Sequence, residues 1–290
     1  MSKERRNQSG VCKLTMESGR FVDSHIIPKS LTRAEGLEPG LAQLGNGRME
    51  RRWSSWYDPS LVIETGEKIL SDYDSWAVAV LRKHKMVWSG WGPMQSLVDV
   101  EPIRGTPWGI RKIEFEVQGD SKRLRLFLLS ILWRASATTR REFSEIQLPK
   151  DDLEKLRRMV LEQNPEPLDF YPASLTQLST LGVRHNHSPI AFTKQIPLLG
   201  GEPGYEEPVF RFFLDGLIVH FSRLSIEKNA ALNLGPLRVG GANSITISTV
   251  RYEDSAQAQN LAIVATEAAL GRPLHMFPQG PFSPGRKMFD

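Results

Sequence analysis

The spacing of apolar residues divides most of this chain into strands and helices. Apolar and charged residues alternate over 111–117, which predicts a half-buried strand. Apolar residues recur at spacings of three and four from 61 to about 84, which predicts an amphipathic helix that starts at Asp58-Pro59-Ser60. A longer apolar helix is predicted over 121–138, and acidic residues precede basic ones in a further helix over 148–162.

The N-terminal third has a less regular pattern. Val11 to Ser24 predicts a β-hairpin that turns at Ser18-Gly19. Pro28 is well placed to begin a short helix that runs to about Arg33. The Gly- and Pro-rich segment 36–47 predicts a loop.

The remaining elements are mostly strands, and they complete an α+β chain. Asp215-Gly216 predicts the turn of a hairpin over 209–223. The other predicted elements are strands at 97–100, 175–183, 190–196 and 244–252, and a helix at 255–270. We expect a basic arm (1–8), an N-terminal module (9–93), a larger mixed α+β domain of unknown role (94–275) and a Pro/Gly-rich tail (276–290).

Composition narrows the function classes only a little. One cysteine in 290 residues excludes an internal disulfide framework, so a cytoplasmic location is expected. A formal charge of +4 is compatible with a nucleic-acid partner. The most apolar run, 124–137, is interrupted by two arginines and is shorter than the roughly 20 apolar residues that a membrane-spanning helix needs, so we expect no membrane partner.

The clearest candidate for chemistry is the histidine in the segment Phe21–Lys29. A run rich in apolar and β-branched residues ends near His25 and is interrupted by Pro28. This pattern predicts a short strand that presents one imidazole and then turns toward a helix. The alternative is a histidine that only ends a strand.

The hexapeptide Ser24-His25-Ile26-Ile27-Pro28-Lys29 resembles a signature of HNH nuclease-like proteins of bacteria and phages, which have the ββα-metal, or treble-clef, fold. The resemblance covers roughly residues 9–85. It implies two Cys-x-x-Cys turns, which align with Cys12–Thr15 and Ile63–Gly66. Only Cys12 is present of the four cysteines, so we expect no structural zinc and expect apolar packing to replace it.

The resemblance also implies roles for particular residues. His25 would be the general base, and Asp58 or Ser60 would replace the usual asparagine of the motif. The metal would be Mg²⁺ or Mn²⁺, which prefer oxygen ligands. The candidate ligands are His25, Glu67 and, as weaker candidates, Glu64 and Asp74. The alternative is that these carboxylates form an ordinary solvated helix face.

Two other groups of residues have polar or basic character. Arginines and aromatic residues interleave near 48–57. The arginines could bind phosphates while the aromatic rings stack on bases. The alternative is that the tryptophans of this segment pack in a core. The candidate nucleic-acid residues are Lys29, Arg48, Arg51, Arg52 and Trp53, with DNA favoured over RNA. His185-Asn186-His187 is interpreted as a polar loop, because a metal pair would lack a third ligand nearby.

Three functions are consistent with these features. The first is a metal-dependent endonuclease, by analogy a phage-defence or mobile-element effector, whose C-terminal domain binds a protein partner or forms a homo-oligomer. The second is a catalytically inactive module of HNH origin that binds nucleic acid or protein. The third is an unrelated protein in which the motif arose by chance.

Overall fold

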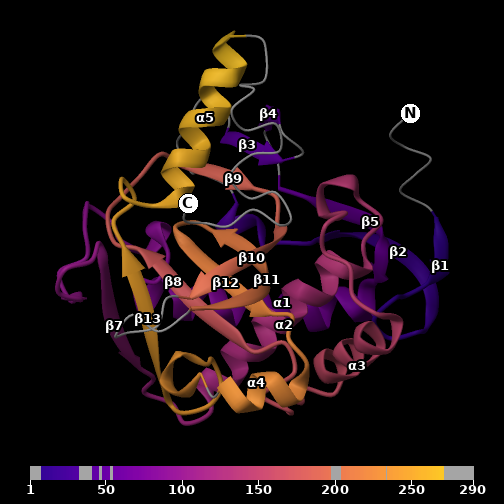
Figure 1. The fold of residues 1–290 in the computed structure, drawn as a ribbon. Coiled ribbons are helices and arrows are strands. Elements are labelled where there is room, and N and C mark those ends of the chain that lie inside the picture. Colours follow the sequence, from indigo (N-terminus) through magenta and orange to yellow (C-terminus); the bar gives the residue numbers. More distant parts are fainter. Residues whose placement is uncertain are drawn as a thin grey trace.

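The computed structural model describes residues 8–32, 41–45, 48–52, 55–196, 204–232 and 234–270. Only the backbone is described at 41–45, 48–52, 264–265 and 267–270. The predicted tail and all but the last residue of the predicted arm lie outside these ranges. The chain has the mixed α+β architecture that its sequence predicts (Figure 1).

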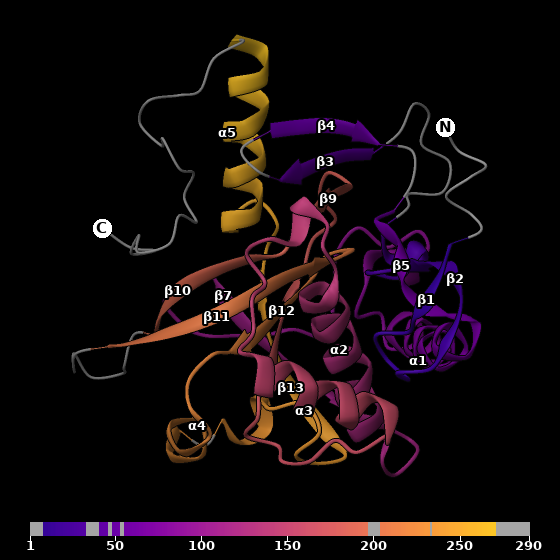
Figure 2. The same cartoon turned by 90° about the vertical axis from the view of Figure 1, so that its right-hand side faces the viewer.

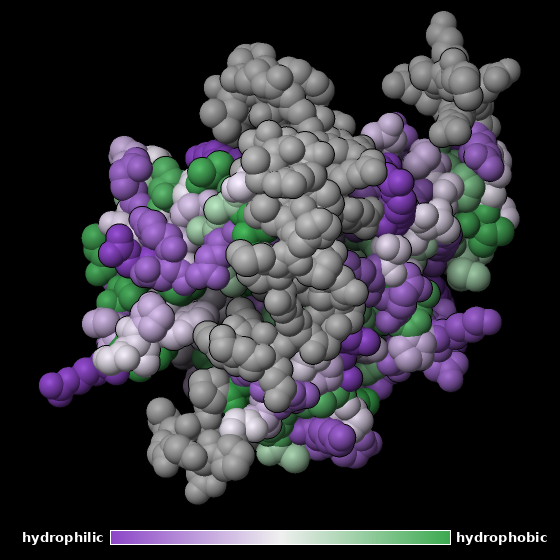
Figure 3. All heavy atoms as spheres, turned by 45° about the horizontal axis from the view of Figure 1, so that its top comes forward, coloured by the Kyte–Doolittle hydropathy of each residue, from purple (hydrophilic) through white to green (hydrophobic). Residues whose placement is uncertain are grey.

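Within the described ranges, no helix combines the length and the apolar character that crossing a membrane requires. On the face in Figure 3, hydrophilic and hydrophobic residues are interspersed over the described surface.

A seven-stranded sheet organises the C-terminal two thirds of the chain. Its strand order is β10-β11-β12-β8-β13-β7-β6, and neighbours are antiparallel except for the parallel pair β13–β8. The strands are β6 (Glu101–Pro102), β7 (Trp108–Glu114), β8 (Ala173–Leu178), β10 (Ile190–Ile196), β11 (Tyr205–Leu214), β12 (Leu217–Ser222) and β13 (Ser244–Val250). The sheet therefore pairs segments that are up to about 140 residues apart in the sequence.

The turn between β11 and β12 follows the sequence prediction. Asp215 and Gly216 both have positive φ, 51° and 88°, as a two-residue hairpin turn of type I′ requires. Gly216 is also required by packing, because a Cβ there would lie 2.6 Å from the Trp88 ring. Local turn chemistry and a long-range contact thus both select glycine at this position.

A smaller sheet and one long helix form the N-terminal part. Strands β1 (Ser9–Val11), β2 (Ser18–His25) and β5 (Tyr57–Ile63) pair antiparallel in the order β1-β2-β5. Helix α1 (Glu64–Lys83) follows β5 directly, with Glu64 and Glu67 in its first turn and Arg82 and Lys83 in its last. This charge order suits the helix dipole.

Two N-terminal boundaries differ from the sequence prediction. Ser18-Gly19 is not the hairpin turn, because both residues pair with β1 inside β2. The turn lies at 12–17 instead, where Met16 has φ 63°. Asp58-Pro59-Ser60 does not begin the helix, since β-branched residues that follow it extend β5 against β2 as far as Ile63.

Three short segments were also predicted incorrectly. Part of the predicted loop at 36–47 is strand β3 (Leu41–Gly45), and the predicted loop at 185–187 is strand β9 (His185–His187). These two strands pair in parallel. Because they are about 140 residues apart in the sequence, no local sequence pattern indicates that they pair. The segment 97–100, predicted to be a strand, has no regular secondary structure. Its Leu97 N–H donates a hydrogen bond to the Ser179 carbonyl oxygen.

A third sheet and the remaining helices complete the described fold. Strand β4 (Arg48–Arg52) completes a third sheet of order β4-β3-β9, beside which α5 (Ala256–Leu270) projects from the body of the protein (Figure 2). Helices α2 (Asp120–Ala137), α3 (Lys150–Leu161) and α4 (Ile226–Leu232) lie lower in the same view. Pro28 precedes only a single 3-10 turn (Lys29–Leu31).

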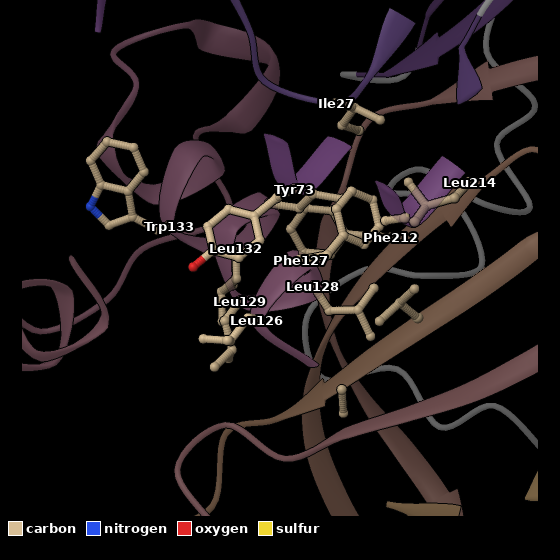
Figure 4. Packing of buried hydrophobic residues seen from close by; sticks show 14 of the residues in the cluster. Ile27, Tyr73, Leu126, Phe127, Leu128, Leu129, Leu132, Trp133, Phe212 and Leu214 are labelled. Atoms are coloured by element: carbon tan, nitrogen blue, oxygen red, sulfur yellow. The ribbon is translucent and has the colours of Figure 1, made fainter. Parts of the chain in front are cut away.

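Helix α2 lies at the centre of the packing. Every residue from Leu124 to Ala135 is buried, and its apolar side chains lie in one cluster with Ile27, Tyr73 and Phe212 (Figure 4). One continuous apolar cluster therefore includes residues from both sides of position 93. The predicted division at 93 and 94 remains a prediction, but its two parts share a core.

Candidate functional site

His25 lies at the end of β2, opposite Tyr57 of β5. Its side chain is half-buried, and its ring forms no hydrogen bond among the residues that the structure describes. Burial lowers the pKa of His25, Lys29 adds to the effect, and Asp74 opposes it. The imidazole is therefore mainly neutral at pH 7 and able to accept a proton.

Glu67 of α1 and Ser24 of β2 form the neighbouring polar pair. Burial raises the pKa of Glu67, and the Ser24 hydroxyl beside it has the opposite, smaller effect. Ser24 is fully buried, yet among the described residues neither its Oγ nor Glu67 Oε2 has a hydrogen-bond partner of normal geometry. Buried polar atoms without partners are costly, and a cation or water would relieve the cost here.

Asp74, a weaker candidate ligand, is on the same helix and pairs with an arginine. Both of its oxygens accept hydrogen bonds from Arg134 of α2, at 2.7 and 2.9 Å. Arg134 is buried and also donates to the His25 carbonyl oxygen at 2.9 Å. Asp74 is thus close to His25, but its carboxylate is already neutralised by a bidentate pair.

Asp58 and Ser60 act together within β5. Asp58 is buried, and one of its oxygens accepts from both the backbone N–H and the hydroxyl of Ser60. The other accepts from Thr138 at 2.6 Å. Burial raises the pKa of Asp58, but the hydrogen bonds from Thr138 and Ser60 outweigh it and leave the pKa below its usual value. These hydrogen bonds engage both oxygens of Asp58, which is typical of a residue with a structural role.

Glu64 and Lys29 are both exposed. Glu64 opens α1, and Lys29 opens the 3-10 turn that follows the candidate histidine. Either side chain can therefore meet a ligand from solvent without rearrangement of the core.

The turn at Cys12 packs against the start of α1. Cys12 is fully buried, and its Sγ accepts a bond from the Thr15 backbone N–H at 3.4 Å. A Cβ on Gly66 would lie only 2.8 Å from that sulfur and 3.1 Å from Val62 Cβ. The two segments that the resemblance aligns with Cys-x-x-Cys turns are thus in direct contact through van der Waals packing.

This contact makes Gly66→Ala a destabilising change, although alanine is intrinsically the better helix former by about 1 kcal/mol. The added methyl overlaps a short, buried side chain that cannot swing away, which typically costs about 1–3 kcal/mol. Urea unfolding should show a net loss of up to about 2 kcal/mol. Ser71→Ala at an exposed position of α1 is the control, and equal stability of the two variants would contradict the packing argument.

The arginines proposed to contact nucleic acid are on β4, the outer strand of the third sheet. Backbone pairing places Arg48 opposite Gly45, Arg51 opposite Ala42 and Arg52 opposite Leu41. Their side chains, and all of Trp53, lie outside the described residues.

The tryptophan that follows these arginines in the sequence, Trp56, is a core residue, which agrees with the alternative that tryptophans of this segment pack in a core. Trp56 is buried edge-on against Phe143.

The three C-terminal histidines are buried rather than on a loop. His185 and His187 form β9, and their Nδ1 atoms lie 2.7 Å from backbone carbonyl oxygens. Their Nε2 atoms meet the side-chain amides of Gln257 and Asn260 on α5, at 2.6 and 2.9 Å. His220 is buried on β12. His185 and His187 thus link strand β9 to helix α5.

Sequence reasoning missed Arg134 as part of the site. The available signal was a charged residue in an otherwise apolar helix, four positions after Ser130. A buried guanidinium needs several acceptors, so its presence in a core helix indicates a partner elsewhere in the chain.

No three His, Cys, Asp or Glu side chains within the described ranges gather closely enough to hold a metal ion. Comparisons with protein-family models, curated proteins and solved structures found no match to this chain. Any functional assignment therefore depends on the local geometry around His25.

Proposed function

We propose that this protein is a metal-dependent endonuclease that hydrolyses phosphodiester bonds of nucleic acid. The observation that carries the proposal is the half-buried imidazole of His25, which directly follows Ser24 in β2, together with the Glu67 oxygen beside Ser24, which is buried and has no hydrogen-bond partner among the described residues. The two groups come from a strand and from the helix that packs against it. A base and a cation-binding carboxylate on rigid elements are the parts that such a reaction needs.

The arrangement of β1, β2, β5 and α1 supports a ββα-metal, HNH-like module. A turn at Cys12 contacts the start of α1 at Gly66, in the positions that the resemblance aligns with the zinc turns. Apolar packing takes the place of zinc in this proposal.

In the proposed mechanism, His25 removes a proton from water as the water oxygen forms a bond to phosphorus. The bond from phosphorus to the leaving sugar oxygen breaks in the same displacement. Because burial lowers the His25 pKa, the base is in its neutral form at pH 7, and activity rises as pH increases through that pKa.

The cation, Mg²⁺ or Mn²⁺, would be held by Glu67 with His25 beside it and would stabilise charge on the phosphate when bound. These ions keep several waters, so few protein ligands suffice. Glu64 is exposed and remains a secondary candidate. Asp74 is a weaker one, since Arg134 occupies both of its oxygens. Asp58 and Ser60 would hold the strand pair that carries His25.

Substrate contact is proposed for the arginines of β4 and for exposed Lys29. Arginines that hold phosphates give affinity without sequence selection, and DNA is the favoured substrate. A cytoplasmic phage-defence or mobile-element role, and a partner or second copy bound by the C-terminal part, complete the proposal by analogy.

The test is cleavage of plasmid DNA and of RNA by the full chain in Mg²⁺, Mn²⁺ or EDTA. We expect cutting only with metal, and a loss of about 10²–10⁴-fold in His25→Ala, the range for a general base. His84→Ala is the matched control, since this half-buried histidine ends α1 and contacts Phe115. Cutting at the wild-type rate by the His25 variant would refute the proposal.

A catalytically inactive binding module is the second candidate. It is favoured by the finding that no trio of metal-ligating side chains is gathered within the described ranges. Nucleic-acid binding without cutting in every metal would support it, and loss of that binding at high salt would indicate phosphate contacts.

A further inference from the structure

Arg134 uses all five of its N–H groups on named acceptors. Nη1 donates to Asp74 and to the His25 carbonyl oxygen, both at 2.9 Å. Nη2 donates to Asp74 at 2.7 Å and to Ser130 Oγ at 3.1 Å, while Nε donates to the Ser130 carbonyl at 3.3 Å. A fully satisfied, buried guanidinium of this kind is a rigid element.

The segment that follows Arg134 contacts the same end of the β2–β5 pair. Arg140 Nη1 donates to the Tyr57 carbonyl at 2.8 Å, and Thr138 donates to Asp58 at 2.6 Å. Tyr57 is the strand partner of His25, and Asp58 is the partner of Ser24. The segment 134–140 therefore donates hydrogen bonds to both strands, at the His25–Tyr57 pair that carries the candidate base.

We propose that Arg134 is a positioning residue that holds His25 in its working orientation by fixing the His25 carbonyl against Asp74. This inference rests on the proposed function and adds that α2, which lies beyond the N-terminal module, completes the site. Asp74 then serves as the anchor of the guanidinium and not as a metal ligand.

Lysine cannot replace arginine in this arrangement. A lysine ammonium is a point charge with three donors, whereas the five contacts here need a planar fork. Arg134→Lys retains the positive charge but leaves at least two acceptors without a donor. The His25 backbone then loses a restraint, and a catalytic group misplaced by about 1 Å costs roughly 10²-fold in rate.

The experiment uses the full chain and two readouts. The first is the imidazole ¹H–¹³C cross-peak of His25 at a fixed pH of about 8, identified by its loss in His25→Ala. In Arg134→Lys we expect this peak to shift and broaden, while those of His84 and His185 stay in place. The second is cleavage, where kcat should fall about 10²-fold with little change in KM. Arg158→Lys on the exposed face of α3 is the control.

Ser130→Ala is the milder variant if Arg134→Lys does not fold. It removes one acceptor of the fork, and a smaller shift of the same His25 peak is expected. A folded variant with an unchanged His25 peak overturns the proposal. If the wild-type protein cuts no nucleic acid, the peak still decides whether Arg134 orients His25, so that failure of the two proposals is distinguishable.

Discussion

Lowering the pH from 6.5 to 5 should remove about 3 kcal/mol of stability through His185 and His187 alone. Burial lowers the pKa of His185 to about 4 and that of His187 to about 3, from the usual 6.5. In this pH range the unfolded chain binds protons that the folded chain does not, so stability falls as pH falls. Each histidine contributes about 1.6 kcal/mol over this interval, because the unfolded imidazole is already half protonated at pH 6.5.

The hydrogen bonds explain why these rings resist protonation. A backbone carbonyl can only accept, so Nδ1 of each ring carries the proton and Nε2 accepts from an amide of α5. A second proton on His185 would face the Gln257 N–H. Gln257 cannot turn its oxygen toward the ring without losing its bond from Arg211.

The measurement is the free energy of unfolding in urea at pH 6.5 and at pH 5. Because carboxyl groups with a raised pKa, such as Glu145, change stability in the opposite direction, the comparison is with His187→Gln. That variant should lose about 2 kcal/mol less than the wild type over the same interval. Identical losses in the two proteins would show that His187 is not held neutral in the folded state.

Arg125→Met should destabilise the protein by about 4 kcal/mol, since single hydrogen bonds to a charged group contribute about 1.5–3 kcal/mol. Arg125 is fully buried in α2 and donates to four carbonyl oxygens of the loop that leads from α3 to β8. The acceptors are Pro165, Pro167, Phe170 and Tyr171, at 2.7–3.4 Å. Burial lowers the pKa of Arg125 to about 10, so the charge persists at neutral pH.

Methionine fills a similar length but supplies no donor, so the loop carbonyls lose their partners. Arg123→Met is the matched control two residues earlier on the same helix. Arg123 is exposed over the Trp76 ring, where a cation–π contact contributes about 0.5–1 kcal/mol. Thermal and urea unfolding of both variants give the comparison. Losses of equal size would mean that the loop does not depend on the guanidinium.

Boundaries fixed by local chemistry were predicted well. The helices at 120–137 and 150–161, the strand at 190–196 and the turn at Asp215-Gly216 all lie within a few residues of their expected positions. Apolar periodicity and turn residues act over a few positions, and they are present in the sequence itself. Strand β9 and the extension of β5 were missed because their partners are distant in the chain.

The sequence alone determined that His25 would end a strand, that an acidic helix would follow, and that the chain would be α+β. Only the tertiary structure decided which charges remain free. It paired Asp74 with Arg134, enclosed Asp58 in hydrogen bonds and, within the part of the chain that is described, left Glu67 Oε2 without a hydrogen-bond partner. Hydropathy patterns specify which face of an element is buried, but the partner of a buried charge is set by segments 60 or more residues away, where no local rule applies.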